Sequence, residues 1–423
     1  MFLFIAFLLP LFGTYGDKGS VIQVIGMLFF ILAGAIDIVR ARLNKRLFKL
    51  DGATTLICFL LPIFSCFALL LNQQPELIPQ TLAFMFCALA ARALILVNGV
   101  IKTIRLIIYV SITMTALTFF IEYEKLVQSL HFAIGEDGGR LRFSPFDNHP
   151  NLTGHIYGFS FLACVVYLYW HKDKRDKFWF VSMLTSVACL FILGGTSSRG
   201  TFVGTFVALG AVYAVHLLHG VNLGRKVINI VVVGVLFFFM ILLTNPEKIA
   251  DYFSELFELN STYRGFDSGL TGRSDNWTVI FAMSLESFDG VVFGHGIRSW
   301  ITSVYGIATD SSYINSLWES GAFLTFAIIM LMVTKIYHAG MASRTFVSDF
   351  YLAIFVFAAV ESIVARYLLG IGNPASLMIL VVLLTPKYMF YSRGKLNETI
   401  FYRTIRGCII KKTYLETKQN SVR

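Results

Sequence analysis

Residues 350–371 read FYLAIFVFAAVESIVARYLLGI, an apolar run that carries two charged residues, Glu361 and Arg366. As a helix, about 20 residues cross the roughly 30 Å of hydrocarbon in a bilayer. The run therefore predicts a membrane-spanning helix. Charged side chains inside such a helix are costly unless they pair or line a wet cavity. We favour a structural pair between Glu361 and an arginine within the spans, Arg366 or Arg92.

Similar runs recur from one end of the chain to the other. Hydrophobic residues make up 56% of the sequence and charged residues 14%, and the mean hydropathy is +0.70. Soluble domains are about 45–50% apolar, so a soluble fold is excluded. We predict an all-α polytopic membrane protein, a single integral domain over residues 1–423, with about twelve transmembrane helices. The apolar runs centre near residues 1–16, 20–40, 54–72, 81–100, 104–121, 154–170, 178–195, 201–218, 227–244, 315–336, 350–371 and 375–392.

The lysines and arginines predict how these helices are oriented. In a twelve-span arrangement most of the 35 basic residues fall in alternate loops and in the tail at residues 393–423, and basic loops stay on the cytoplasmic side. We therefore expect both termini in the cytoplasm and two loops outside, at residues 121–153 and 245–314. The net charge of +10 is mostly this orientation signal. Nucleic acid is not an expected partner, because the basic residues are scattered over short loops.

The cysteines give no sign of a metal centre. Five of the six lie in apolar runs and one, Cys408, lies in the tail. Their spacing matches no metal-ligand pattern, so we expect no disulfide, no metal site and no cofactor.

The outer loop at residues 245–314 is the longest polar interruption of the apolar pattern, and such loops often carry function. Arg, Asp, Trp and Gly are concentrated in it and just after it. The segments are GRSDNW at residues 272–277, FGHGIRSW at 293–300, DSSY at 310–313 and WESG at 318–321.

Two amphipathic helices are expected in this loop. From Trp277 onward the apolar residues follow helical spacing, which predicts an interfacial helix with Arg273 at its start and Ser274 as a possible N-cap. A second helix is expected near residues 249–257. For His295, between two glycines, we favour a turn position over a ligand.

Arg199 lies in GGTSSRG at residues 194–200, a turn between two predicted spans. A guanidinium beside the free N–H groups of a helix start can bind an anion. The alternative is an arginine whose charge reaches the membrane surface while its stem packs on apolar groups.

Asp310 has two interpretations. An acid in a partly dry outer site can act as a general base, whereas the same acid before a helix can be an N-cap, and position alone favours the cap. In the loop at residues 121–153, polar residues either bind sugar hydroxyls or form a turn before Pro150. They are Arg140, Arg142, Asp147, Asn148, His149, Asn151 and His155, the two histidines being alternative bases.

These segments, in this order, resemble the O-antigen polymerase/ligase superfamily of bacterial membrane glycosyltransferases. Family members have a Ser-Arg-Gly turn between two spans, like residues 198–200, and an Arg-x-x-x-Trp segment, like residues 273–277. A Gly-x-Gly turn follows, like residues 294–296, and then a Glu-x-Gly segment, like residues 319–321. The ordered set carries the resemblance, since each motif alone is common.

The resemblance implies transfer of a glycan from a polyprenyl diphosphate to an acceptor hydroxyl, outside a bacterial cytoplasmic (inner) membrane and facing the periplasm. It implies that Arg199 and Arg273 bind the diphosphate and that Asp310 is the base. We expect further substrate contacts from Arg298, Arg264, Arg142, Asn151, His149 and Tyr313. The expected partners are an undecaprenyl-diphosphate-linked donor, a glycan acceptor, membrane lipid and a chain-length regulator.

One departure from the family bears on the reaction. Ligases that move O-antigen onto lipid A–core have a His where this chain has Asp310, which favours a polymerase of repeat units. A ligase remains an alternative. A lipid-linked glycan transporter is a second alternative, although it would need charged or broken helices at the bilayer midplane in both halves of the chain.

Overall fold

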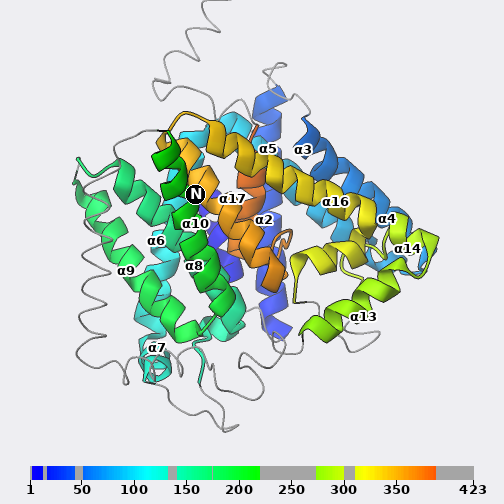
Figure 1. Ribbon diagram of the computed structural model, residues 1–423, viewed down its shortest axis with the longest axis horizontal. Coiled ribbons are helices and arrows are strands. Elements are labelled where there is room, and N and C mark those ends of the chain that lie inside the picture. The colour runs from blue at the N-terminus through cyan, green and yellow to red at the C-terminus, as the bar shows by residue number, and fades with distance from the viewer. Residues whose placement is uncertain are drawn as a thin grey trace, which may run out of the picture.

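The computed structural model describes residues 2–12, 17–42, 51–131, 141–173, 175–219, 273–299 and 310–386. Within these ranges all regular structure is helical, as predicted, and nine helical segments are long and apolar enough to cross a membrane (Figure 1). They are α2 (Asp17–Arg42), the continuous α3–η2–α4 segment (Gly52–Leu71), η3–α5 (Pro75–Asn98), α6 (Val100–Ile121), α8 (Pro150–Trp170), α9 (Lys177–Thr196), α10 (Arg199–Leu218), α16 (Ser312–Met341) and α17 (Phe346–Val364).

Three of the twelve predicted runs do not appear as long helices. The run at 227–244 lies outside the described residues. The run at 1–16 forms only α1 (Phe2–Leu8) and a 3-10 turn, η1 (Leu9–Leu11), because Pro10 lacks an N–H and disfavours helix at the residue before it. The run at 375–392 gives α18 (Pro374–Leu383), which is too short to span alone.

Several shorter helices lie in the loops between the spans. In the loop at residues 121–153 α7 (Tyr123–Leu130) follows α6, and a 3-10 turn, η4 (Pro145–Asp147), precedes α8. The loop at residues 245–314 contains α13 (Arg273–Leu285) and α14 (Phe288–Val292). The predicted helix after Trp277 is confirmed in α13. However, α13 begins at Arg273, so Ser274 lies within the helix and is not its N-cap.

Helix α17 is the centre of the bundle, in contact with α8, α10, α16 and α18 (Figure 1). Its residues from Phe350 to Ala358 are buried, and α18 is buried along its whole length. By contrast, α9, α10 and α16 leave large apolar side chains exposed, among them Phe180, Phe206 and Phe326. Exposed apolar faces of this kind fit contact with lipid.

Two cations from other helices hold the buried C-terminal end of α18. Arg92 Nη1 donates to Leu384 O at 2.6 Å, and Lys335 Nζ donates to Thr385 O. Cations are favourable there because the last carbonyls of a helix carry partial negative charge. Arg92 also pairs with Asp51, at 3.1 Å between Nη1 and Oδ2. The acid that pairs with Arg92 is thus Asp51, whereas the prediction had named Glu361 as the partner of Arg366 or Arg92.

Between α17 and α18 the backbone is not helical, although residues 350–371 predict one span. Buried backbone groups outside a helix need other partners, and serines supply them. Ser312 donates to Ala365 O from its N (3.0 Å) and its Oγ (2.6 Å), and Leu368 N donates to Ser312 Oγ at 3.2 Å. Ser376 Oγ donates to Tyr367 O. The Ser312 bonds fix the start of α16 against the end of α17, and the Ser376 bond fixes the start of α18 against the connection between the two helices.

Candidate functional site

The candidate site lies where the end of α17 meets the start of α10. Thr201 Oγ1 donates to Glu361 Oε1 at 2.8 Å. A Cβ placed on Gly200 would lie 2.3 Å from Val364 Cγ2, so only glycine allows this approach. Arg199 is the first residue of α10, and the predicted turn that carries it therefore packs directly on the last turn of α17.

Arg273 and Asp310 come together at the same end of α17. Arg273 Nε lies 3.0 Å from Asp310 Oδ2, and the two side chains are 20% and 43% exposed. Ser311, not Asp310, is the N-cap of α16, since Ser311 Oγ accepts from Ile314 N at 3.5 Å. The N-cap interpretation of Asp310 is thus wrong. Its carboxylate instead pairs with Arg273, which lies 37 residues earlier in the chain.

Glu361 links the two predicted arginine segments. Its carboxylate is contacted by Thr201 in the turn with Arg199, and it interacts electrostatically with Arg273. Ser311 Oγ also donates to Ser362 O at 3.2 Å. Arg199, Arg273 and Asp310 therefore belong to segments that converge on Glu361 and Ser362, although Arg199 comes from the turn at residues 194–200 and the other two from the loop at 245–314.

A buried polar group lies behind this meeting point. His155 Nδ1 is 3.9 Å from Glu361 Oε1, and both side chains are almost fully buried. Among the described residues, neither ring nitrogen of His155 nor Glu361 Oε2 has a hydrogen-bond partner. Phe357 and Tyr367 flank the imidazole at centroid distances of 5.5 and 5.4 Å. Unpaired buried polar groups are costly, so His155 and Glu361 are candidates for a role in the site.

The sequence only partly indicated this pair. His155 was expected in the first outer loop as an alternative base, but it lies inside α8. Glu361 was expected to pair with Arg366 or Arg92, and its closest described partners are Thr201 and His155. The sequence feature that could have indicated this pair is Glu361 itself, an acid in a largely apolar span.

The loop at residues 121–153 holds helix ends together beside the site. Arg142 Nε donates to Thr196 O at 2.8 Å, and Arg142 Nη2 donates to Asn151 Oδ1 at 2.9 Å. His149 caps α8 by accepting from Asn151 N at 3.2 Å. Arg142 thereby connects the end of α9 to the start of α8, near the Arg199 turn.

Helix α16 is broken at Gly321, whose backbone angles are φ 75° and ψ 170°. The break removes the usual i+4 donors from the preceding carbonyls. The turn at residues 294–296 replaces them, because His295 N donates to Trp318 O and Gly296 N donates to Glu319 O, both at 2.8 Å. The Gly-x-Gly turn and the Glu-x-Gly segment are therefore hydrogen-bonded to each other at the break in α16. We call this contact the joint.

Side chains reinforce this joint. The His295 ring stacks on Trp318 with centroids 3.6 Å apart, and Arg298 N donates to Glu319 Oε1 at 2.9 Å. Burial lowers the pKa of His295, although its bond to Trp318 O acts in the opposite direction. Burial thus favours the neutral form of the ring, as suits a turn residue packed on an aromatic ring.

Two further predicted contact residues, Tyr313 and Arg298, interact with α17 and α16. Tyr313 OH donates to Ala359 O at 3.0 Å and so ties α16 to α17. The charge of Arg298 acts on Glu319 at the joint. Arg264 and the predicted helix near 249–257 lie outside the described residues.

The arrangement offers guanidinium groups for an anion and a carboxylate that can accept a proton. In the parts of the chain that the structure covers, no group of three or more His, Cys, Asp or Glu side chains could hold a metal ion. No protein-family model matches the chain, and no curated protein matches it at a significant level.

Proposed function

We propose that this protein is a membrane glycosyltransferase that polymerises oligosaccharide repeat units linked to a polyprenyl diphosphate. One observation carries the proposal: the Arg273–Asp310 pair lies at the end of α17, where the helix that begins with Arg199 also packs. The pair supplies an anion-binding group and a proton acceptor at one place. A polymerase is favoured over a ligase because this chain has Asp310 at the position where ligases carry His.

In the proposed reaction the acceptor hydroxyl attacks C1 of the donor sugar, and the C1–O bond to the diphosphate breaks. Negative charge grows on the leaving diphosphate, where Arg199 and Arg273 stabilise it. Asp310 takes the proton of the hydroxyl as the new C1–O bond forms. No nucleotide is needed, because the donor already carries its diphosphate leaving group.

The ion pair between Arg273 and Asp310 suggests how donor binding prepares the base. A diphosphate competes with Asp310 for the guanidinium, since both offer oxygens that fit the arginine fork. Breaking the pair costs little, because exposed ion pairs contribute about 0–1 kcal/mol. Donor binding would thus release the carboxylate beside the acceptor hydroxyl.

The proposal includes an orientation. The basic loops and tail lie in the cytoplasm, and the loops at 121–153 and 245–314 lie in the periplasm of a bacterial cell. The polyprenyl chain would lie along exposed apolar faces of the spans while the sugars remain outside. Accessibility of cysteines introduced in these loops to an impermeant thiol reagent would test this topology.

The decisive experiment mixes the purified protein with lipid-linked repeat units, a second lipid acceptor and no other enzyme. A ladder of longer lipid-linked chains supports the polymerase. Transfer to the second acceptor identifies a ligase instead. Absence of any new covalent product, with the donor crossing the bilayer of a vesicle, identifies a transporter.

Asp310→Asn is expected to slow turnover by about 10²–10⁴ through loss of the general base. Donor affinity should stay the same or rise, because the amide competes less strongly for Arg273 than the carboxylate does. Single-turnover rates and donor binding by the purified variant would be measured together. Asp275→Asn is a matched control, since Asp275 is an exposed acid in the first turn of α13. An unchanged rate in Asp310→Asn would assign the proton to another group.

A further inference from the structure

Glu361 is a buried acid with an incomplete set of hydrogen bonds. Among the described residues its Oε1 accepts one hydrogen bond, from Thr201 Oγ1 at 2.8 Å, and its Oε2 accepts none. An ionised carboxylate has room for about four such bonds. Because this carboxylate receives only one, most of its charge acts on electrostatic partners, and these interactions are strong in the low dielectric of a protein interior.

Arg273 is the electrostatic partner of Glu361. Its guanidinium is therefore attracted by two acids, since Asp310 also pairs with it at 3.0 Å. The two acids differ in exposure, because the Asp310 side chain is 43% exposed and that of Glu361 is almost fully buried. An incoming diphosphate can replace the exposed Asp310, whereas the buried Glu361 stays in place and continues to attract Arg273.

Glu361 also fixes the start of α10 through Thr201. The single hydroxyl proton of Thr201 is donated to Glu361, so the 2.9 Å bond between Ser198 Oγ and Thr201 Oγ1 must be donated by Ser198. Ser198 is the N-cap residue of α10, yet its side chain makes no capping bond. The N–H groups at the start of α10, next to Arg199, are therefore not covered by the Ser198 hydroxyl. Such groups suit the oxygens of a phosphate.

Close packing between α10 and α17 transmits the position of Glu361. A Cβ placed on Gly204 would lie 3.4 Å from Phe357 Cδ2 and 3.7 Å from Glu361 Oε2. Together with the approach of Gly200 to Val364, this contact brings the α10 backbone against α17 side chains over one helical turn. Interiors packed at this density transmit small displacements, so a shift of the Glu361 side chain moves the start of α10.

We propose that Glu361 is a positioning residue of the diphosphate site. Its carboxylate attracts Arg273 and, through Thr201, fixes the turn that carries Arg199, so that both guanidinium groups face one diphosphate. The inference rests on the proposed glycosyl transfer, whose donor supplies that diphosphate. Positioning of this kind has a large effect on rate, because a misplacement of about 1 Å can cost about 10²-fold.

Glu361→Gln is the central variant. Its amide oxygen can still accept from Thr201, and its amide nitrogen can donate to His155, whose Nδ1 lies 3.9 Å from Glu361 Oε1. The charge that attracts Arg273 is lost, so single-turnover glycosyl transfer should slow by up to about 10²-fold. The midpoint of thermal unfolding should stay the same or rise, because a buried charge with few hydrogen bonds is costly. A residue with only a structural role would lower the midpoint instead.

Double variants show which groups Glu361 acts through. In the Arg273→Ala background, Glu361→Gln should have no further effect on the rate, because the group that it positions is already gone. Thr201→Val removes the hydroxyl at nearly constant volume and should likewise have no further effect in the Arg199→Ala background. Thr201→Ser should keep the wild-type rate. Fully additive losses in both backgrounds would overturn the positioning role.

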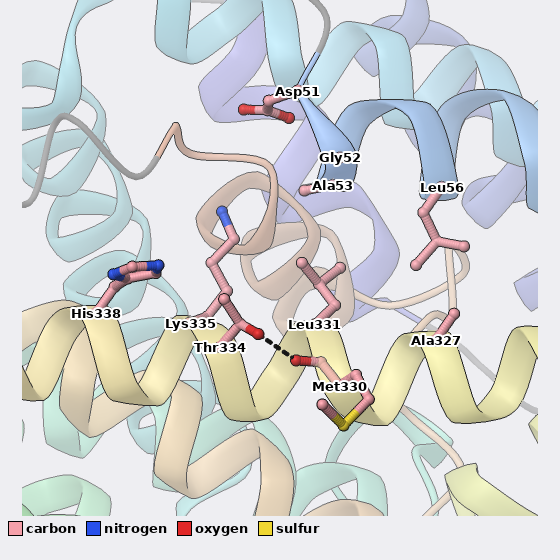
Figure 2. A pocket seen from close by; sticks show the side chains of 10 residues that line it. All are labelled: Asp51, Gly52, Ala53, Leu56, Ala327, Met330, Leu331, Thr334, Lys335 and His338. Atoms are coloured by element: carbon pink, nitrogen blue, oxygen red, sulfur yellow. Dashed lines mark hydrogen bonds between the residues drawn. The ribbon is translucent and has the colours of Figure 1, made fainter.

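Thr334→Val is the matched control for Thr201→Val. Thr334 Oγ1 donates to Met330 O at 2.6 Å, and Thr334 lines a cavity of about 350 Å³ between the start of the α3–η2–α4 span and the second half of α16 (Figure 2). The candidate site involves the opposite end of α16, so loss of the Thr334 hydroxyl should leave the rate unchanged. Glu124→Gln, at an exposed acid of α7, is the control for Glu361→Gln.

Binding of farnesyl diphosphate, a short polyprenyl diphosphate, separates this inference from the proposed reaction. Measured by calorimetry on the purified full-length protein, its affinity should fall about 2- to 30-fold in Glu361→Gln and stay unchanged in Glu124→Gln. If the wild type binds it but forms no product, the proposed reaction fails, and the affinity of Glu361→Gln still decides the role of Glu361. Wild-type rate and affinity in Glu361→Gln would overturn that role alone. A wild type that neither binds farnesyl diphosphate nor forms product would overturn both proposals.

Discussion

Arg273→Ala is expected to lower the rate of glycosyl transfer by about 10²–10³, the usual effect of losing one preorganised donor to a developing negative charge. The protein should remain inserted and folded, because the ion pair with Asp310 is partly exposed and such pairs contribute about 0–1 kcal/mol. Single-turnover conversion of lipid-linked repeat units by purified protein is the measurement. Thermal unfolding of the same samples shows whether the fold is kept.

Companion variants separate charge from geometry. Arg273→Lys keeps the charge but loses the planar fork that binds two phosphate oxygens, so its rate should lie between wild type and alanine. Arg199→Ala should resemble Arg273→Ala, and the double variant should be less than additive if both groups act on one diphosphate. Arg105→Ala, at an exposed arginine of α6, is the control. Near-normal product from both single variants would show that Arg273 and Arg199 do not stabilise the leaving diphosphate.

The spans were predictable from sequence because bilayer thickness sets the length of an apolar helix. The run at 350–371 shows the limit of that rule. It forms α17 only as far as Val364, because Ser311 and Ser312 bond the backbone from Ser362 to Ala365. Those serines are distant in sequence from the end of α17, so no local sequence pattern indicates that the helix ends there.

The candidate site was predictable in its parts but not in its assembly. Arg273 and Asp310 were both expected in the outer loop, yet their contact depends on where α13 and α16 begin in space. The partner of Glu361 could not be predicted, since it depends on the packing of α8, α10 and α17. A Cβ on Gly158 would lie 2.7 Å from Thr201 Cγ2 and 3.0 Å from Phe357, so glycine permits that close approach.

Gly321→Ala is expected to cause the largest loss of stability. Gly321 has φ 75° and ψ 170°, a region open essentially to glycine alone and costing other residues about 1–3 kcal/mol. A Cβ there would also lie 2.6 Å from Val291 O, and overpacking of this kind adds about 1–3 kcal/mol. Together these effects are a large share of the roughly 5–15 kcal/mol that stabilises a folded domain. The midpoint of thermal unfolding in detergent should fall by several degrees.

Gly210→Ala is the matched control, because it adds the same methyl group where nothing lies within 4 Å. Gly210 is inside α10, where alanine is favoured over glycine by about 0.5–1 kcal/mol, so this variant should be as stable as wild type or more so. Gly294→Ala should behave like Gly321→Ala, since its Cβ would lie 2.5 Å from Gly321 N. A stable Gly321→Ala protein would mean that α16 runs unbroken through this position. The turn at residues 294–296 would then have no free carbonyls to bind, and the two motifs would not form one joint.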